Sequence, residues 1–233
     1  MPDIISIGEC MIELFSEEPI ESADFFTRSF AGESVNILVA ASRLGNTTGY
    51  ITRLGSDPFT PYLLGSWQRE GIDTSQSKQV PGFNAVHFIA TLPNGERDFV
   101  YYRKDSAPTT INPTDIDPNY IRQAKIMHIS GVAQAISPTA GDAVLHAAQI
   151  ARENNITVSY DPNYRHQLWS HTDARAGMER VIPYVDYFLP SLPADTDVLF
   201  GTQDAQTIID QSLESGATIV AVKMGAEGAI IGT

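Results

Sequence analysis

Short apolar runs alternate with amphipathic segments of about 10 to 15 residues along most of this chain, and this alternation restricts the possible folds strongly. Each run has the length and apolar character of a buried strand. The predicted strands of this kind are residues 4–8, 48–54, 126–130, 156–160, 187–189 and 218–222. Because strands separated by helices pair in parallel through right-handed crossovers, the pattern predicts a doubly wound α/β fold with a mostly parallel sheet.

The segments between these runs carry the start and stop signals of helices. Gly45, Gly71 and Gly216 each end an amphipathic segment, as a glycine at a helix C-terminus does. Ser137 supplies a capping hydroxyl, and Pro138 suits the first helical position. The predicted helices are residues 34–44, 59–69, 137 to about 154, 172 to about 181 and 204–215. An apolar run at 228–233 predicts a further strand that is only beginning where the chain stops.

Four other segments alternate apolar and polar residues with period two and predict a small antiparallel sheet. They are residues 10–15, 25–30, 85–92 and 98–103, and Pro93-Asn94-Gly95-Glu96 joins the last two as a turn. Such a sheet could form a lid over the carboxyl ends of the parallel strands, extend an edge for dimer contacts, or do both. We therefore expect one α/β domain, residues 1–233, with lid segments at about 10–30 and 84–104.

Composition and charge argue against several function classes. The chain has 233 residues and a formal net charge of −13, which repels a nucleic-acid backbone. Cys10 is the only cysteine, so neither an intramolecular disulfide nor a cysteine-based zinc site can form, and no two histidines have the close helical spacing of a metal pair. No apolar run approaches the roughly 18 residues that span a bilayer, and the N-terminus has no basic targeting region. We expect a cytoplasmic protein that binds neither nucleic acid nor membranes.

Two groups of residues near the predicted lid are candidates for ligand binding. Gly32 and Asn36 lie between a lid strand and a helix start, where backbone N–H groups can approach a ligand because glycine has no side chain. Tyr101 and Arg103 face the same side of their strand. A tyrosine hydroxyl beside a guanidinium could bind a carboxylated sugar, although a cross-strand aromatic and charge pair would give the same pattern.

Two further candidate segments directly follow predicted parallel strands, and ligands of open α/β sheets bind beyond such strand ends. Residues 161–165, Asp-Pro-Asn-Tyr-Arg, follow strand 156–160. An acidic protein must focus positive charge locally to hold an anion, which draws attention to Arg103, Lys104 and Arg165, although each alone could equally be a solvated surface charge. Residues 223–228 follow strand 218–222, and their glycines would let the backbone pass close to a nucleotide. A hairpin turn would use the same residues.

An ordered set of motifs resembles the ribokinase-like (PfkB) carbohydrate kinases over essentially the whole chain. The motifs are Ala31-Gly32-Glu33-Ser34-Val35-Asn36, Arg43-Leu44-Gly45, Arg53-Leu54-Gly55-Ser56-Asp57, Tyr101-Tyr102-Arg103-Lys104, Asp161-Pro162-Asn163-Tyr164-Arg165 and Val222-Lys223-Met224-Gly225. The resemblance implies a Rossmann-like α/β domain with a β-sheet lid. It also implies that ATP, with Mg²⁺, phosphorylates the 6-hydroxyl of 2-keto-3-deoxygluconate. We further expect a homo-oligomer formed through the lid.

The resemblance also implies roles for individual residues. The sugar would be bound by Gly32, Asn36, His87, Tyr101, Arg103 and Arg165. The ATP site would be bordered by Asn163, Ser191, Lys223, Gly225 and Gly228. Asp195 would orient magnesium through water. His87 stands where the family often has a tyrosine, so it can still donate a hydrogen bond but changes the pocket.

One motif of the family does not occur in these 233 residues. It is a Gly-Ala-Gly-Asp turn, whose aspartate accepts the proton of the sugar hydroxyl and whose backbone N–H groups stabilise the developing anion. Ala140-Gly141-Asp142 looks similar, but the helix that starts at Ser137 and Pro138 places Asp142 inside the helix. We therefore expect a C-terminally truncated kinase that binds sugar poorly and catalyses no transfer, with its catalytic base absent from the chain.

Three functions stay open at this point. The first is a 2-keto-3-deoxygluconate kinase. The second is a fructokinase or ribokinase that phosphorylates another hydroxyl. Tyr101 with Arg103 favours a carboxylated sugar, and therefore the first function over the second. The third is a non-catalytic sugar-binding or scaffold protein that dimerises through its lid. In each case, an incomplete sheet would leave apolar faces exposed and favour association.

Overall fold

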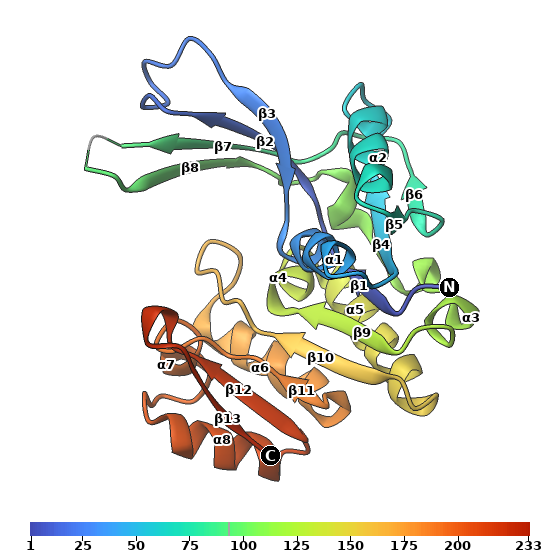
Figure 1. Ribbon diagram of the computed structural model, residues 1–233, viewed down its shortest axis with the longest axis vertical. Coiled ribbons are helices and arrows are strands. Elements are labelled where there is room, and N and C mark those ends of the chain that lie inside the picture. Colours follow the sequence, from blue (N-terminus) through green and yellow to red (C-terminus); the bar gives the residue numbers. More distant parts are fainter. Residues whose placement is uncertain (93) are drawn as a thin grey trace.

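The computed structural model describes residues 1–92 and 94–233, and a large mixed sheet forms its centre (Figure 1). The strand order is β13-β12-β11-β10-β9-β1-β4-β5, and β6 pairs with β4 off this path. The strands are β1 (Ile4–Ile7), β4 (Thr48–Leu54), β5 (Ile72–Asp73), β6 (Ser77–Gln79), β9 (Ile126–Ser130), β10 (Thr157–Asp161), β11 (Tyr187–Phe188), β12 (Ile219–Lys223) and β13 (Ala229–Gly232). All these pairs are parallel except β12 with β13. The predicted mostly parallel α/β fold is confirmed.

The five longer helices agree with the predicted ones to within a residue at each end. They are α1 (Glu33–Arg43), α2 (Thr60–Arg69), α5 (Pro138–Glu153), α6 (His171–Val181) and α8 (Ala205–Glu214). The predicted cap is present, because the Ser137 hydroxyl accepts a hydrogen bond from the Ala140 N–H at 3.1 Å. The helices that sequence patterns did not predict are α3 (Pro118–Ile121), α4 (Gly131–Ala135), α7 (Thr196–Leu199) and the 3₁₀ turns η1 (Ala107–Thr110), η2 (Pro113–Asp115), η3 (Ile182–Tyr184) and η4 (Gly225–Glu227). Such short pieces contain too few residues to show a helical period.

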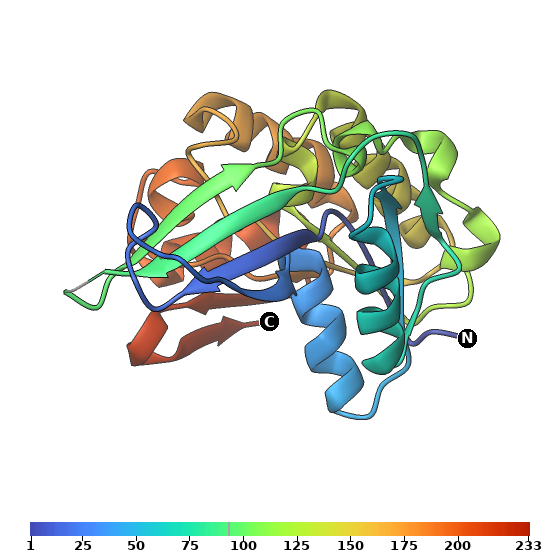
Figure 2. The same cartoon turned by 90° about the horizontal axis from the view of Figure 1, so that it is seen from above.

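A second sheet of four strands, the lid, stands apart from the large sheet and joins it near α1 (Figures 1 and 2). Its order is β3-β2-β7-β8, with β2 (Met11–Ser16), β3 (Thr27–Ala31), β7 (Val86–Thr91) and β8 (Arg97–Tyr102). The prediction of an antiparallel sheet is wrong for its central pair, because β2 and β7 run parallel. The chain passes through β3, α1, β4 and α2 between these two strands, so no hairpin dictates their direction.

The predicted turn between the last two lid strands falls partly outside the described residues, because Pro93 is not among them. The flanking strands β7 and β8 are antiparallel, as a hairpin requires. Within the described part of the turn, the Gly95 N–H donates to the Leu92 carbonyl at 2.8 Å, and Gly95 has a φ of 83°. Glycine adopts this left-handed conformation without steric cost, which explains its place in the turn.

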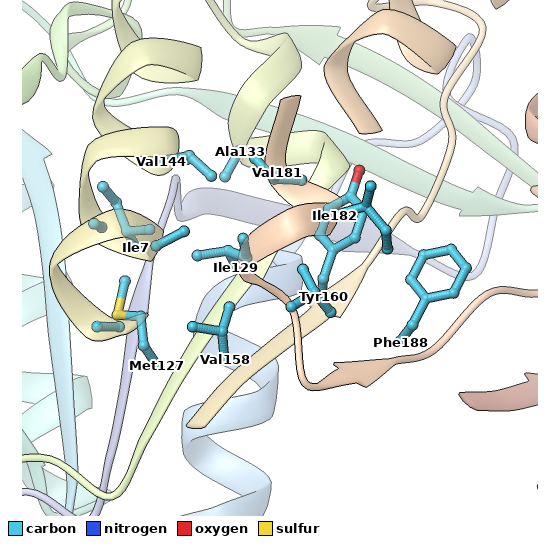
Figure 3. Close-up of a cluster of buried hydrophobic side chains, with 14 of the residues drawn as sticks. Ile7, Met127, Ile129, Ala133, Val144, Val158, Tyr160, Val181, Ile182 and Phe188 are labelled. Atoms are coloured by element: carbon cyan, nitrogen blue, oxygen red, sulfur yellow. The ribbon is translucent and has the colours of Figure 1, made fainter. Parts of the chain in front are cut away.

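Two apolar clusters cover the two faces of the large sheet. Strand residues alternate between them, so Ile51 joins one cluster while its neighbour Tyr50 joins the other. The larger cluster packs β-strand residues such as Ile129, Val158 and Phe188 against α5 and α6 (Figure 3). It also includes Ile208 and Ile209 of α8. The smaller cluster contains residues of α1 and α2. Among the helices described, none has both the length and the apolar character that a bilayer crossing requires.

Candidate functional site

A cleft of about 1170 Å³ is lined jointly by the lid and by the carboxyl ends of the parallel strands. Lid strands β2, β7 and β8 contribute lining residues, as do α1 and the segments that follow β1 and β10. Because β1, β9 and β10 are neighbours in the sheet, their carboxyl ends meet at one edge, where open α/β sheets bind ligands. The lid therefore has the placement that its sequence pattern suggested.

The structure brings all six predicted sugar-binding residues to this cleft. The lining residues include Gly32, Asn36, His87, Tyr101, Arg103 and Arg165, together with Asn163 from the predicted nucleotide group. These residues come from α1, two lid strands and the loop after β10, which are far apart in the sequence. Their assembly in one cleft is consistent with the roles that the motifs implied.

Gly32 occupies a position where no side chain fits. A Cβ atom at Gly32 would lie 2.3 Å from the carbonyl oxygen of Glu9, which belongs to the backbone and cannot easily move aside. The backbone at Gly32 is extended, so the requirement for glycine is steric and not conformational. Its carbonyl accepts the N–H of Asn36 at 2.9 Å as α1 begins. The close approach of these two segments thus holds the start of α1 beside the cleft.

A polar cluster on the lid faces the cleft. Nε2 of His87 lies 3.2 Å from Oε2 of Glu13, and the other carboxylate oxygen, Oε1, accepts the Ser29 hydroxyl at 2.7 Å. Burial lowers the pKa of His87, while the charge of Glu13 opposes that effect. The Tyr101 ring packs edge-on against His87 with 5.7 Å between centroids, and burial raises the pKa of Tyr101. The lid therefore presents a phenol hydroxyl and a paired imidazole to a ligand.

Arg103 forms a buried ion pair with Glu9 at the junction of the lid and β1. Glu9 is 1% exposed, and burial lowers the pKa of Arg103 to about 10, with a smaller contribution from the positive charge of Arg165. Glu9 thus compensates much of the charge that Arg103 brings to the cleft. Arg97, Lys104 and Arg165 all line the cleft without an ion pair to any residue in 1–92 or 94–233, so these three cations are available to an anionic ligand.

Most of the predicted nucleotide-binding residues lie outside the lining of this cleft. Lys223 donates from Nζ to Asp161 at 2.5 Å, and it forms a parallel bridge with Ser191. Gly225 and Gly228 lie in the turn between β12 and β13, so the hairpin interpretation of this segment is confirmed. Both glycines have positive φ, and no atom lies within 4 Å of where their Cβ atoms would be. Their backbone is therefore accessible to a ligand as well.

Asp195, the candidate magnesium residue, is buried and connects two loops. Its two carboxylate oxygens accept the N–H groups of Ser191 at 2.6 Å and Tyr164 at 2.7 Å. Asp195 thereby ties the loop after β10 to the loop after β11, and a role at a metal stays a prediction. In the described ranges, no group of three or more His, Cys, Asp or Glu side chains is arranged to hold a metal ion. Asp142 lies inside α5, as predicted, and its carboxylate pairs with Arg180 at 2.8 Å.

Seven polar residues that sequence reasoning did not select also line the cleft: Glu9, Glu13, Glu33, Arg97, Thr109, His128 and Gln167. Glu9 lies just beyond the carboxyl end of β1, so the argument applied to residues 161–165 would have identified it. Glu13 is the register partner of His87, which depends on the parallel β2–β7 pair. Burial, and then the charge of Lys223, lower the pKa of His128 to about 4, so it is neutral at pH 7. The cleft thus contains three carboxyl groups and one further arginine that sequence reasoning did not select.

Comparison with known proteins gives consistent matches over the whole chain. The profile of the pfkB family carbohydrate kinases matches residues 1–233. A 2-dehydro-3-deoxygluconokinase of Bacillus subtilis (strain 168) is 28% identical over 99% of this chain and 72% of its own length. A probable fructokinase-3 of Arabidopsis thaliana is 29% identical over 91% of this chain and 61% of its own length. The crystal structure of a PfkB protein from Polaromonas sp. JS666 superposes with a TM-score of 0.94 at 31% identity, covering 99% of this chain and 79% of that one.

Proposed function

Since this chain belongs to the pfkB family of carbohydrate kinases, we propose that its sugar substrate is 2-keto-3-deoxygluconate, which ATP phosphorylates at the 6-hydroxyl. The observation that carries the proposal is the cleft under the lid, where Arg165 has no ion-pair partner among the described residues. A guanidinium recognises a carboxylate through two parallel hydrogen bonds. The phenol of Tyr101 lines the same cleft and adds a neutral donor.

The residues after β12 fit the nucleotide that this function requires. The open space beside Gly225 and Gly228 leaves the backbone accessible, and Lys223 lies at the end of the same strand. When bound, ATP supplies the γ-phosphoryl group, and Mg²⁺ neutralises charge on its phosphates. Asp195 does not fit a direct metal ligand, because both of its oxygens accept backbone N–H groups. The protein's own part is to bind the sugar with Arg165 and Tyr101 and to cover it with the lid.

A kinase for a neutral sugar such as fructose is the second candidate, and a specific observation favours it. Glu9 pairs with Arg103, and Glu13 pairs with His87, so two of the cationic or basic groups in the cleft already have carboxylate partners. A cleft with this charge balance has less positive potential to offer the carboxylate of a sugar acid. The two candidates therefore differ in whether Arg165 binds a substrate carboxylate.

The two candidates can be separated by calorimetric titration of the 233-residue chain with 2-keto-3-deoxygluconate and with fructose. We expect weak binding of both sugars by these 233 residues, but tighter binding of the sugar acid than of fructose. Arg165→Met should lose tenfold or more in affinity for the sugar acid, because a hydrogen bond to a charged group contributes about 1.5–3 kcal/mol. Fructose binding should change much less. Arg180→Met, which removes an exposed arginine on α6, is the matched control.

Tighter binding of fructose than of the sugar acid would contradict the first candidate and support the second. Equal losses for both sugars in Arg165→Met would mean that Arg165 shapes the cleft without recognising a carboxylate. Failure of the chain to bind either sugar would contradict both candidates.

A further inference from the structure

Asp195 is a buried carboxylate whose two oxygens both accept backbone N–H groups. Its exposed fraction is 1%, and Oδ1 accepts the N–H of Tyr164 at 2.7 Å while Oδ2 accepts the N–H of Ser191 at 2.6 Å. No Lys, Arg or His among the described residues forms an ion pair with it. A buried carboxylate is costly unless its oxygens are hydrogen-bonded, so these two N–H groups stabilise Asp195 in its position. In return, Asp195 fixes the backbone of both loops at one point each.

The loop after β10 is tightly constrained just before it reaches Arg165. The carbonyl oxygen of Pro162 occupies the space that a Cβ atom at Gly131 would need, so the loop contacts the start of α4 directly. Oδ1 of Asp161 accepts the N–H of Asn163 at 3.1 Å. Asn163 has a φ of 41°, a left-handed conformation that asparagine tolerates better than most residues do. The path of the chain as far as residue 163 is therefore defined by local contacts.

Tyr164 connects this constrained segment to Arg165. Its ring packs edge-on against His171 with 5.5 Å between centroids, and its hydroxyl donates to the carbonyl of Trp169 at 3.3 Å. Its backbone N–H donates to Asp195. Arg165 itself has no ion pair with a described residue that could hold its guanidinium. The direction of the Arg165 side chain thus depends on the backbone that Asp195 holds.

The second oxygen of Asp195 ties the same carboxylate to the ends of two further strands. Ser191 lies in the segment that follows β11, and residues 190–192 pair with the backbone of Lys223 at the end of β12. Nζ of Lys223 donates at 2.5 Å to Asp161, which ends β10. Because β10, β11 and β12 are neighbours in the sheet, these contacts form a closed ring across three strand ends. The ring holds Asp195 relative to the sheet, and not only relative to a loop.

We propose that Asp195 is a positioning residue for sugar recognition, which through the N–H of Tyr164 holds Arg165 where its guanidinium meets the carboxylate of a sugar acid. This inference rests on the proposed function, since it takes Arg165 to recognise that carboxylate. Two parallel hydrogen bonds to a carboxylate require a fixed guanidinium plane, so a small displacement of Arg165 weakens them. The role needs neither Mg²⁺ nor nucleotide, which separates it from the predicted role of Asp195 at a metal.

The test is calorimetric titration of the 233-residue chain with 2-keto-3-deoxygluconate and with fructose, in EDTA and without nucleotide. Asp195→Asn keeps the shape of the side chain, but its amide nitrogen is a donor and cannot accept one of the two N–H groups. We expect about a fivefold loss in affinity for the sugar acid and a change within about twofold for fructose. Asp115→Asn is the matched control, because Asp115 is a buried carboxylate that does not line the cleft. It should leave both affinities within about twofold.

A double variant shows whether Asp195 acts through Arg165. Once Arg165→Met has removed the guanidinium, adding Asp195→Asn should cause no further loss for the sugar acid, because no guanidinium is left to position. Losses that add in the double variant, equal losses for both sugars, or an unchanged affinity in Asp195→Asn would each overturn the inference and leave the proposed function intact. If Arg165→Met affects both sugars equally, the proposed function and the inference are both overturned. If Asp195→Asn does not fold, the same comparisons are made with Asp195→Glu, which keeps both acceptors but is one methylene longer and must displace Tyr164.

Limited proteolysis provides a second measurement that needs no ligand. Trypsin cleaves after exposed arginines in segments that open locally, and both Arg165 and Arg97 are exposed. We expect cleavage after Arg165 to be about fivefold faster in Asp195→Asn, while cleavage after Arg97 on the lid keeps its rate. Mass spectrometry of the fragments identifies the two sites. Equal rates at Arg165 in the unmodified chain and in Asp195→Asn would mean that Asp195 does not hold this loop, and would overturn the inference whichever sugar binds.

Discussion

At the residue scale, the Glu9–Arg103 ion pair couples the end of β1 to the end of the lid strand β8. Glu9 is fully enclosed, and the Arg103 side chain is 16% exposed, so each charge depends on the other for compensation. Arg103 was predicted to bind substrate, and the structure shows that it also has this internal partner. The pair therefore affects both the position of the lid and the charge of the cleft.

Replacing Glu9 by Gln should destabilise the chain by about 3 kcal/mol, because it leaves the Arg103 charge buried without compensation. The free energy of unfolding in urea at pH 7 is the measurement. Glu13→Gln is the matched control: it removes the partly exposed carboxylate that pairs with His87 and should cost much less. The double variant Glu9→Gln/Arg103→Met should be more stable than Glu9→Gln alone. If Glu9→Gln unfolds like the unmodified chain, the pair contributes nothing to the fold.

At the element scale, the start of α1 is held in place by the close contact between Gly32 and the backbone at Glu9. The contact brings Glu33 and the candidate ligand-binding residue Asn36 to the cleft on the first turns of the helix. The rest of α1 packs Val35 and Leu38 into the smaller apolar cluster. Any side chain at position 32 must therefore push α1 away from β1 or distort the turn.

Gly32→Ala should lower stability by about 1–3 kcal/mol, the usual cost of inserting atoms where no space exists, and should weaken sugar binding as α1 shifts. Urea unfolding and calorimetric titration measure the two effects. Gly65→Ala in α2 is the matched control, because its Cβ would meet only the end of the Arg69 side chain at 3.5 Å. Alanine should stabilise that helix by about 0.5–1 kcal/mol. Equal effects of the two substitutions would refute the steric explanation.

At the scale of the whole molecule, β13 forms one edge of the large sheet and carries exposed apolar side chains. Ile231 is 65% exposed, and Ile230 is 42% exposed. Such an edge presents unpaired backbone groups beside apolar surface, a combination that favours pairing with another chain. The lid also carries exposed aromatic side chains, such as Tyr102, so the predicted lid-mediated oligomer has surface available but stays a prediction.

We expect the 233-residue chain to self-associate through the β13 edge, and Ile231→Lys to reduce that association. A lysine on an edge strand discourages pairing because its charge would have to be desolvated. Light scattering coupled to gel filtration, over a range of protein concentrations, measures the average mass. Leu44→Lys is the control, since Leu44 is 83% exposed but lies at the end of α1 and not on a sheet edge. An unchanged mass distribution in Ile231→Lys would locate the association elsewhere.

Local patterns in the sequence determined the type and order of the main elements. The ends of the longer helices follow from signals such as Ser137 and Gly45, which act on their immediate neighbours. The position of residues 161–165 at the cleft follows from the general behaviour of parallel strand ends. These features are predictable because the forces behind them act within a few residues or apply to the whole fold class.

Only the tertiary structure decided which polar groups meet across the cleft. The parallel β2–β7 pair, and hence the contact of Glu13 with His87, depends on a crossover that no local pattern specifies. Glu9 and Arg103 are 94 positions apart in the sequence, so their pairing depends on how the lid docks on the sheet. The same holds for Glu33, whose pKa is raised by burial among strand ends and by Asp161, a residue far from it in the sequence. The pKa of a side chain in the cleft depends on its burial and on its ion-pair and hydrogen-bond partners. Both arise only when distant segments of the chain come together.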